Sequence, residues 1–287
     1  MASVEPAGSY HGGVAPAISV EEVARQAAAI AREIPLDELD ALAGGNPHVR
    51  IDDLHAGYGQ MEILHGLNLR VGHGQSLCLI GPNGAGKSTV LHSIFGFTNI
   101  YSGSIAIARD SRSLDVTRLT PNEKLRSAGI AYILQDNSVF PNMTVEENLW
   151  MGGFLMVQPA QAKRAAEKVF DKYPRLAARR KHAAKVLSGG ERRLLEISRA
   201  LVMEPQILLV DEPSIGLEPR FIDMVFEILG DLQHKEGKTI VIVEQNAKKG
   251  LEFADIGYVL VSGQLAKAGS GDDLLKDADV GRLFLGG

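Results

Sequence analysis

Short apolar runs bounded by turn residues recur along the chain from residue 49 onward. Runs of this length, rich in Val, Ile and Leu and flanked by Gly, Asp or Pro, are typical of buried strands. The last two runs flank Ser262-Gly263 and predict a hairpin. The predicted strands are Val49–Leu54, Leu67–Val71, Ser76–Ile80, Ser104–Ala108, Ile130–Leu134, Ile207–Val210, Thr239–Val243, Ile256–Val261 and Gln264–Ala268.

Other segments place apolar residues three and four positions apart, the spacing of one helix face. Residues from about 137 to 203 are largely of this kind and lie inside the series of strands. Strands that alternate with helices indicate an α/β core, and helices inserted between the strands indicate a separate helical lobe. The predicted helices are Val90–Phe95, Ala160–Tyr173, Glu191–Met203 and Phe221–Gln233.

The start of the chain has a different pattern, which predicts a helical N-terminal extension (1–47) ahead of one main domain (48–287). Residues 1–17 are rich in Gly, Ala, Pro and Ser and are expected to be flexible. Capping-box spacing and apolar positions at helical period predict a short amphipathic helix over residues 20–34. A further turn or two is predicted at Leu36–Ala43. Two roles fit the amphipathic helix: packing on the main domain, or docking on a partner or a membrane surface.

Composition narrows the function classes without naming one. The 287 residues are 45% hydrophobic and 23% charged, with a formal net charge of -5. This acidic balance gives no reason to expect a nucleic-acid partner. The single cysteine, Cys78, lies in a predicted buried strand and is expected to pack rather than react. No apolar run approaches the roughly 20 residues of a membrane span, and no signal peptide is evident, so a membrane role would act through a partner.

A glycine-rich loop follows the predicted strand Ser76–Ile80 and precedes a predicted helix. In this context glycines let backbone N–H groups point at phosphate oxygens at a helix N-terminus. Lys87 is expected to reach the β- and γ-phosphates, and the Ser88 hydroxyl to bind Mg²⁺. The loop therefore predicts a site for a nucleoside triphosphate. Its residues are Gly81, Pro82, Asn83, Gly84, Ala85, Gly86, Lys87, Ser88 and Thr89.

Two adjacent acids end the apolar strand Ile207–Val210. Asp211 is expected to hold the magnesium ion, directly or through water, and Glu212 to polarise the attacking water. Two acids at a strand end are often only a solvated turn. The phosphate loop upstream favours the catalytic interpretation.

Between the loop and the acids lies Leu187-Ser188-Gly189-Gly190-Glu191. With this element the chain resembles the ATP-binding subunits of ABC transporters, from about Val49 to the C-terminus. The resemblance implies a P-loop NTPase core with an antiparallel β subdomain and an inserted α-helical lobe. It also implies ATP and Mg²⁺ as the bound nucleotide and metal.

The resemblance assigns further residues. Tyr58 matches the aromatic residue that stacks on adenine, and Gln135 the glutamine that contacts magnesium and the attacking water. Ser188, Gly189 and Gly190 match the family signature, which completes the ATP site of a second subunit in a head-to-tail dimer. Glu191 and Glu218 stand where glutamine and aspartate are more usual.

The sharpest departure from the family pattern is Gln245. Most ABC subunits have a histidine there, which contacts the γ-phosphate. A glutamine amide can donate a hydrogen bond but cannot carry a positive charge. The run Glu244-Gln245-Asn246, together with Phe140–Leu149, is similar to one subgroup, the smaller ATP-binding subunit of branched-chain amino acid (Liv-type) importers. Urea and short-chain amide importers are closely related to it and are an alternative.

The resemblance implies that ATP hydrolysis powers solute uptake from the cytoplasmic face of the cell membrane, with the chain bound peripherally. The implied partners are transmembrane permease subunits, a separate solute-binding protein and a second ABC ATPase subunit. That second subunit is expected to be a different chain, with a homodimer as the alternative. Asp136–Leu149 is expected to border the permease groove, or else to cover the helical lobe. A soluble ABC ATPase without a permease and a regulatory subunit that barely hydrolyses ATP are further alternatives.

Overall fold

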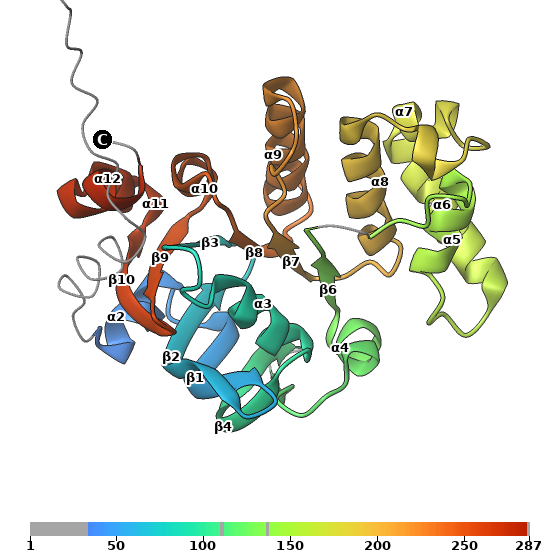
Figure 1. Cartoon of the computed structure of the whole chain (residues 1–287). Coiled ribbons are helices and arrows are strands. Elements are labelled where there is room, and N and C mark those ends of the chain that lie inside the picture. Colours follow the sequence, from blue (N-terminus) through green and yellow to red (C-terminus); the bar gives the residue numbers. More distant parts are fainter. Residues whose placement is uncertain (1–33, 110–111, 136–137, 286–287) are drawn as a thin grey trace, which may run out of the picture.

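The computed structural model describes residues 34–109, 112–135 and 138–285. The predicted helix over residues 20–34 and the predicted flexible segment 1–17 lie outside the described residues, apart from Ile34. Within the described residues the chain forms two sheets, with strand orders β2-β1-β4-β5 and β10-β9-β3-β8-β7-β6. Figure 1 shows helices α5 to α8 gathered on one side of the second sheet and α10 to α12 toward the other. The fold class predicted from the sequence is confirmed.

The four-stranded sheet is antiparallel. Its first two strands run well past the predicted bounds and meet in a tight hairpin, with Tyr58 opposite Met61. The predicted bounds covered only part of each strand and left out Ala56 and Leu64, which are fully buried. The strands are β1 (Pro47–Tyr58), β2 (Met61–Gly72), β4 (Asn99–Arg109) and β5 (Arg112–Asp115).

The six-stranded sheet is parallel except for its last strand, β10, which pairs antiparallel with β9 as the predicted hairpin. Four of its strands, β3, β7, β8 and β9, are buried along their full length, as expected for strands with both faces covered. Cys78 on β3 is fully buried, and burial raises the pKa of its thiol. The strands are β3 (Ser76–Ile80), β6 (Ile130–Ile133), β7 (Ile207–Asp211), β8 (Thr239–Val243), β9 (Ile256–Val261) and β10 (Gln264–Ser270).

Helices flank this sheet, and a further group forms a lobe between β6 and β7 with its own apolar core. In that lobe α5 packs on α6 and on α8. The helices beside the sheet are α3 (Lys87–Phe95), α4 (Pro121–Ala128), α9 (Pro219–His234), α10 (Ala247–Phe253), α11 (Gly271–Lys276) and α12 (Ala278–Phe284). Those of the lobe are α5 (Val145–Gly152), α6 (Pro159–Lys172), α7 (Pro174–Ala178), the 3-10 turn η1 (Ala184–Val186) and α8 (Gly189–Leu201).

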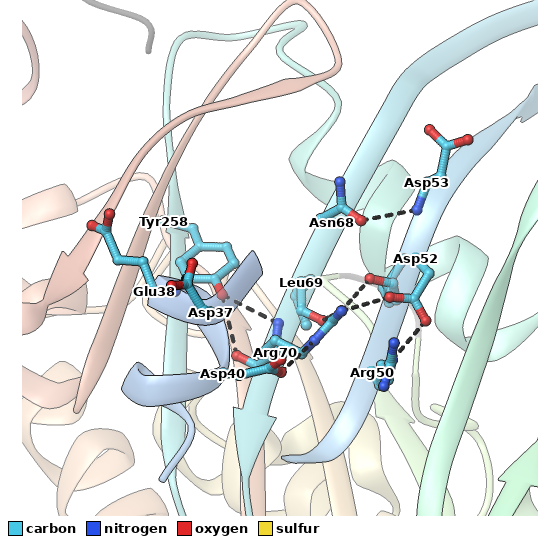
Figure 2. Close-up of polar contacts among 11 residues, drawn as sticks. Asp37, Glu38, Asp40, Arg50, Asp52, Asp53, Asn68, Leu69, Arg70 and Tyr258 are labelled. Carbon is cyan, nitrogen blue, oxygen red and sulfur yellow. Dashed lines mark hydrogen bonds and ion pairs between the residues drawn. The ribbon is translucent and has the colours of Figure 1, made fainter. Parts of the chain in front are cut away.

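A buried arginine fastens α2 (Leu36–Leu42) to the antiparallel sheet (Figure 2). The Arg70 side chain is fully buried, and its Nε donates to Asp40 Oδ1 at 2.9 Å. One terminal nitrogen donates to Asp52 Oδ1 at 2.5 Å. Leu39, on the same helix as Asp40, is fully buried in the core. A buried guanidinium is stable only when its donors are paired, so the contact with Asp40 ties α2 to the antiparallel sheet.

Candidate functional site

The parallel strands β3, β7 and β8 all end at one edge of the sheet, where their loops meet. A cavity of about 480 Å³ opens there. It brings together residues of the phosphate loop with both Glu212 and Gln245, which follow β7 and β8. Carboxyl ends of parallel strands are where open α/β sheets bind ligands. The lining residues are Ile63, Asn83, Gly84, Gly86, Lys87, Ser88, Thr89, Glu212 and Gln245.

The phosphate loop ends in a helix start that has no side-chain cap. Gly86 is the N-cap of α3 with a φ of 96°, a left-handed conformation that favours glycine. No side chain accepts a hydrogen bond from the first N–H groups of α3. Such a helix start is suited to an external anion.

Lys87 folds back over this loop. Its Nζ donates to the carbonyls of Gly81 at 2.9 Å and Pro82 at 3.0 Å. The side chain is largely buried, and desolvation lowers its pKa, opposed by the nearby carboxylates of Glu212 and Asp211. The ammonium is desolvated and its present partners are neutral carbonyls. An anionic phosphate beside it would therefore stabilise its charge.

Asp211 lies between the phosphate loop and β6. Asp211 is only 4% exposed, and its carboxylate accepts hydrogen bonds on both oxygens. Ser88 Oγ donates to Oδ1 at 3.1 Å, and the Tyr132 hydroxyl donates to Oδ2 at 2.7 Å. Burial and the Asp211 charge raise the pKa of Tyr132, so its hydroxyl keeps the proton that it donates. The structure thus places two of the three predicted metal ligands, Ser88 and Asp211, in contact, whereas the third, Gln135, contacts Glu212.

Glu212 has a strained backbone. Its φ is 42°, in the left-handed region, and its N–H donates to the carbonyl of Val243 at 2.8 Å. Gln135 Nε2 donates to Glu212 Oε2 at 3.1 Å. Strain in a non-glycine residue persists only where the surroundings hold it, and it is common in active sites. Two of the predicted catalytic residues therefore meet at the end of β7.

The third predicted catalytic residue, Gln245, is exposed on the turn between β8 and α10. Its neighbour Glu244 is buried, and Glu244 Oε1 accepts from Ser214 Oγ at 2.6 Å and from the Asn246 N–H at 3.0 Å. Glu244 thus holds the turn from inside, and Gln245 lines the cavity. Sequence reasoning missed this role of Glu244, although its place in a strand-end motif was visible.

Tyr58 stands apart from the cavity lining, at the end of β1. Its ring is 43% exposed, and its hydroxyl lies 2.5 Å from His92 Nδ1 on α3. The two rings meet edge to face, with centroids 6.1 Å apart. An exposed aromatic ring held beside α3 can accept a stacked base.

The signature residues are not brought to this cavity. Ser188 caps α8 with Glu191: the Glu191 N–H donates to Ser188 Oγ at 3.3 Å, and Glu191 accepts from the Ser188 N–H at 3.0 Å. Gly190 packs against the ring of Phe221, which a Cβ would approach to 2.2 Å. Gly189 lines a different cavity of about 410 Å³, together with Gln135.

Arg193, also missed from the sequence, ties the signature helix to the sheet. It donates to the carbonyls of Leu134 at 2.9 Å and Asp211 at 3.2 Å, at the ends of β6 and β7. It also pairs with Glu196 at 2.7 Å. A helical arginine gives no sequence signal that distinguishes this contact from an ordinary surface position.

The residues at the edge of the sheet fit magnesium. Ser88, Asp211 and Gln135 offer hydroxyl, carboxylate and amide oxygens, the hard donors that Mg²⁺ prefers. Among the described residues, no group of three or more His, Cys, Asp or Glu could hold a metal. Such a sparse set suits magnesium, which keeps waters and is shared with substrate phosphates.

Comparisons with known proteins agree with this geometry. The model of the ABC transporter family matches residues 64–215. The high-affinity branched-chain amino acid transport ATP-binding protein BraG of Pseudomonas aeruginosa is 39% identical over 82% of this chain and 98% of its own length. The probable branched-chain amino acid transport ATP-binding protein LivF of Archaeoglobus fulgidus is 36% identical over 83% and 98%. The lipopolysaccharide export system ATP-binding protein LptB of Haemophilus influenzae is 29% identical over 82% and 95%.

Among solved structures, the ADP conformation of an ATP-binding cassette of an ABC transporter is similar, with a TM-score of 0.72. It is 28% identical and covers 84% of this chain and 99% of its own. None of the helices in the described residues combines the length and the apolar character that a bilayer crossing requires. Together the family match, the relatives and the fold identify the chain as a member of the ABC transporter ATP-binding proteins, and thus as the ATPase subunit of a transporter.

Proposed function

We propose that this chain hydrolyses ATP to drive import of branched-chain amino acids, or of a related small polar solute, through a separate permease. The observation that carries the catalytic part is the contact of Gln135 with Glu212, a residue that lines the phosphate-loop cavity. The solute class is supported by the similarity to BraG and LivF. Urea or short-chain amides are the alternative, and LptB shows that a more distant relative serves export.

Each residue has a distinct part in hydrolysis. Lys87 would leave its carbonyl partners for the β- and γ-phosphates, together with the N–H groups at the start of α3. Glu212 would accept a proton from the attacking water, which Gln135 orients. Gln245 would donate a hydrogen bond from its side-chain amide to the γ-phosphate. Tyr58 would stack on adenine.

Magnesium, when bound, neutralises charge that develops on the phosphates. Ser88, Asp211 and Gln135 would hold it. Ser88 and Asp211 already share a hydrogen bond, so their oxygens are near enough to one another to face one ion.

The separation of the signature from the cavity supports a sandwich of two subunits. Ser188, Gly189 and Gly190 of this chain would close on ATP bound by a second ABC ATPase subunit, which we expect to be a different chain. Partly exposed apolar residues would dock the permease, namely Val139, Phe140, Pro141 and Met143. Such a subunit would sit peripherally on the cytoplasmic face of the cell membrane and serve a separate solute-binding protein.

Two variants test the ATPase assignment, with ATP affinity measured on the purified chain and hydrolysis on the assembled transporter. Lys87→Ala is expected to lower ATP affinity by at least about 100-fold, since it removes a charge-assisted contact with the phosphates. Glu212→Gln is expected to keep ATP affinity and lose nearly all hydrolysis, because an amide cannot accept the proton. Isothermal titration and phosphate release are the measurements. Unchanged affinity in Lys87→Ala would refute the phosphate-loop assignment, and wild-type turnover in Glu212→Gln would place the base elsewhere.

The solute is tested separately, in cells that lack this subunit. Loss of leucine uptake with retention of urea uptake supports the amino-acid assignment, and the reverse supports the alternative. Restoring the intact gene, but not the Glu212→Gln variant, controls for the ATPase. Uptake of both at wild-type rates would remove the import proposal while leaving the ATPase assignment intact.

A further inference from the structure

The hydroxyl of Tyr132 donates a hydrogen bond to one oxygen of the Asp211 carboxylate. We infer that Tyr132 is a positioning residue that orients Asp211 so that its other oxygen faces the magnesium position beside Ser88. This inference rests on the proposed function, since it concerns the metal side of the ATP site. Tyr132 belongs to neither of the two motifs, the phosphate loop and the pair of acids, from which the site was predicted.

The geometry divides the two carboxylate oxygens between different donors. Asp211 Oδ2 accepts from Tyr132 at 2.7 Å, and Oδ1 accepts from Ser88 at 3.1 Å. The outer torsion of an aspartate is broad and roughly two-fold, so a carboxylate without a fixed donor can rotate. A short hydrogen bond to one oxygen selects the orientation of both.

The donor itself is held rigidly. Tyr132 lies on β6, and its ring contacts three aromatic side chains from α3 and the loop that follows. Ring-centroid distances are 5.7 Å to His92, 5.6 Å to Phe95 and 5.9 Å to Phe97. Because both the strand and the ring are packed, the hydroxyl has little freedom to leave Asp211.

The two donors differ in what else they can do. Ser88 is the proposed metal ligand, so its oxygen can serve either Asp211 or the ion. Tyr132 donates its hydroxyl hydrogen bond to Asp211 and lies outside the cavity lining. The Tyr132 contact is therefore compatible with the metal-bound site, whereas the Ser88 contact competes with it.

The aromatic cluster also links this contact to the base position. His92 packs edge to face on Tyr132 and lies 2.5 Å from the Tyr58 hydroxyl through Nδ1. The same side chains thus support the proposed adenine platform and the metal carboxylate. A structural role in that cluster is the competing explanation, and the experiment must separate the two.

Tyr132→Phe removes only the hydroxyl and keeps the ring. We expect it to raise the Mg²⁺ concentration needed for half-maximal binding of a non-hydrolysable ATP analogue by about tenfold, the loss expected for one hydrogen bond to a charged group. Affinity for the analogue in EDTA is expected to stay within about twofold, since the phosphate loop is unchanged. Both are measured by titration on the full chain.

Tyr258→Phe is the matched control. Tyr258 is fully buried, and its hydroxyl accepts from the Arg70 N–H at 3.2 Å, in the contact between β9 and β2. Tyr258→Phe is expected to lower thermal stability, as Tyr132→Phe does. It is expected to leave the Mg²⁺ dependence of analogue binding unchanged. An equal Mg²⁺ dependence in Tyr132→Phe and wild type would overturn the inference. An equal fall of affinity with Mg²⁺ and in EDTA would also overturn it, in favour of a packing role.

Asp211→Asn, made in wild type and in Tyr132→Phe, provides a second measurement. If Tyr132 acts through Asp211, the effects of the two changes on Mg²⁺ dependence are expected to be non-additive. Additive effects would overturn the inference. Failure of the proposed function gives a different result, because Lys87→Ala would then bind the analogue as wild type does.

Discussion

Two helix N-termini in this molecule carry glycine-rich motifs, and they differ in how their first N–H groups are capped. α3 begins after Gly86 with no side-chain cap. α8 begins after Ser188 with a complete capping box, in which Ser188 and Glu191 satisfy each other's N–H groups. Both ends carry the partial positive charge of a helix start. The first is left open to a ligand, whereas the second is largely satisfied by its own chain.

This difference accounts for the roles proposed for the two motifs. The open end of α3 gains most from an anion, which suits tight ATP binding by one chain. At α8 the Ser188 oxygen already accepts a hydrogen bond, but its hydroxyl hydrogen can still donate to a partner's phosphate. Glu191 adds a negative charge there, offset by Arg179 at 3.2 Å. A weaker, reversible contact suits a surface that must close and reopen.

Gly190→Ala is expected to have the largest effect at α8. A Cβ would lie 2.2 Å from the Phe221 ring, so α8 and α9 must shift. Overpacking of this kind costs about 1 to 3 kcal/mol of unfolding free energy. Denaturant unfolding measures that cost, and hydrolysis by the assembled transporter is expected to fall strongly. ATP affinity of the isolated chain is expected to be unchanged, and its loss would show that the two helix starts are not independent.

Ser188→Ala is expected to have an intermediate effect. Loss of an N-cap side chain costs about 1 kcal/mol of unfolding free energy. ATP-driven pairing with the second subunit is expected to weaken, because the donor to the partner's phosphate is gone. Sedimentation with and without ATP checks this. Thr120→Ala, which removes the matching capping box of α4, is the control for stability alone. Equal pairing in both variants would argue against the Ser188 contact.

Glu191→Gln is expected to have the smallest effect, visible as a pH dependence. The Ser188 N–H, followed by Arg179, lowers the pKa of Glu191 from its ordinary 4.5. A lowered folded-state pKa stabilises the protein above the unfolded value, and this stabilisation is lost as pH falls through the folded value. The difference in melting temperature between wild type and variant is therefore expected to shrink below about pH 4.5. A constant difference would mean that the carboxylate charge does not contribute.

Local patterns were a better guide to which residues meet at the edge of the sheet than to the full length of the elements. The phosphate loop, Asp211 and Glu212 were identified because each motif is contiguous and follows an apolar strand. α4 was missed even though Thr120 and Glu123 form a capping box, because its residues are mostly polar and give little apolar periodicity. The outer parts of β1 and β2 were also missed, because Gly57 and Gly66 interrupt the apolar residues there.

Contacts between distant segments could not be predicted in this way. The residues Tyr132 and Asp211 lie on neighbouring strands, yet 79 positions separate them in sequence. Arg70 is similar: a lone arginine at the end of an apolar strand looks exposed until α2 supplies Asp40. Such partners follow from the order of strands in the sheets, which hydrophobic pattern alone does not determine.

The buried thiol on β3 offers a built-in probe for local opening of the parallel sheet. Cys78 is the single cysteine of the chain and is fully buried. It lies on β3, the strand that leads directly into the phosphate loop. Thiol-directed reagents can reach it only when the centre of the parallel sheet separates. Alkylation rates with and without nucleotide would then give the energy of that opening without any label. A cysteine introduced on the surface could in turn be modified selectively in the native state.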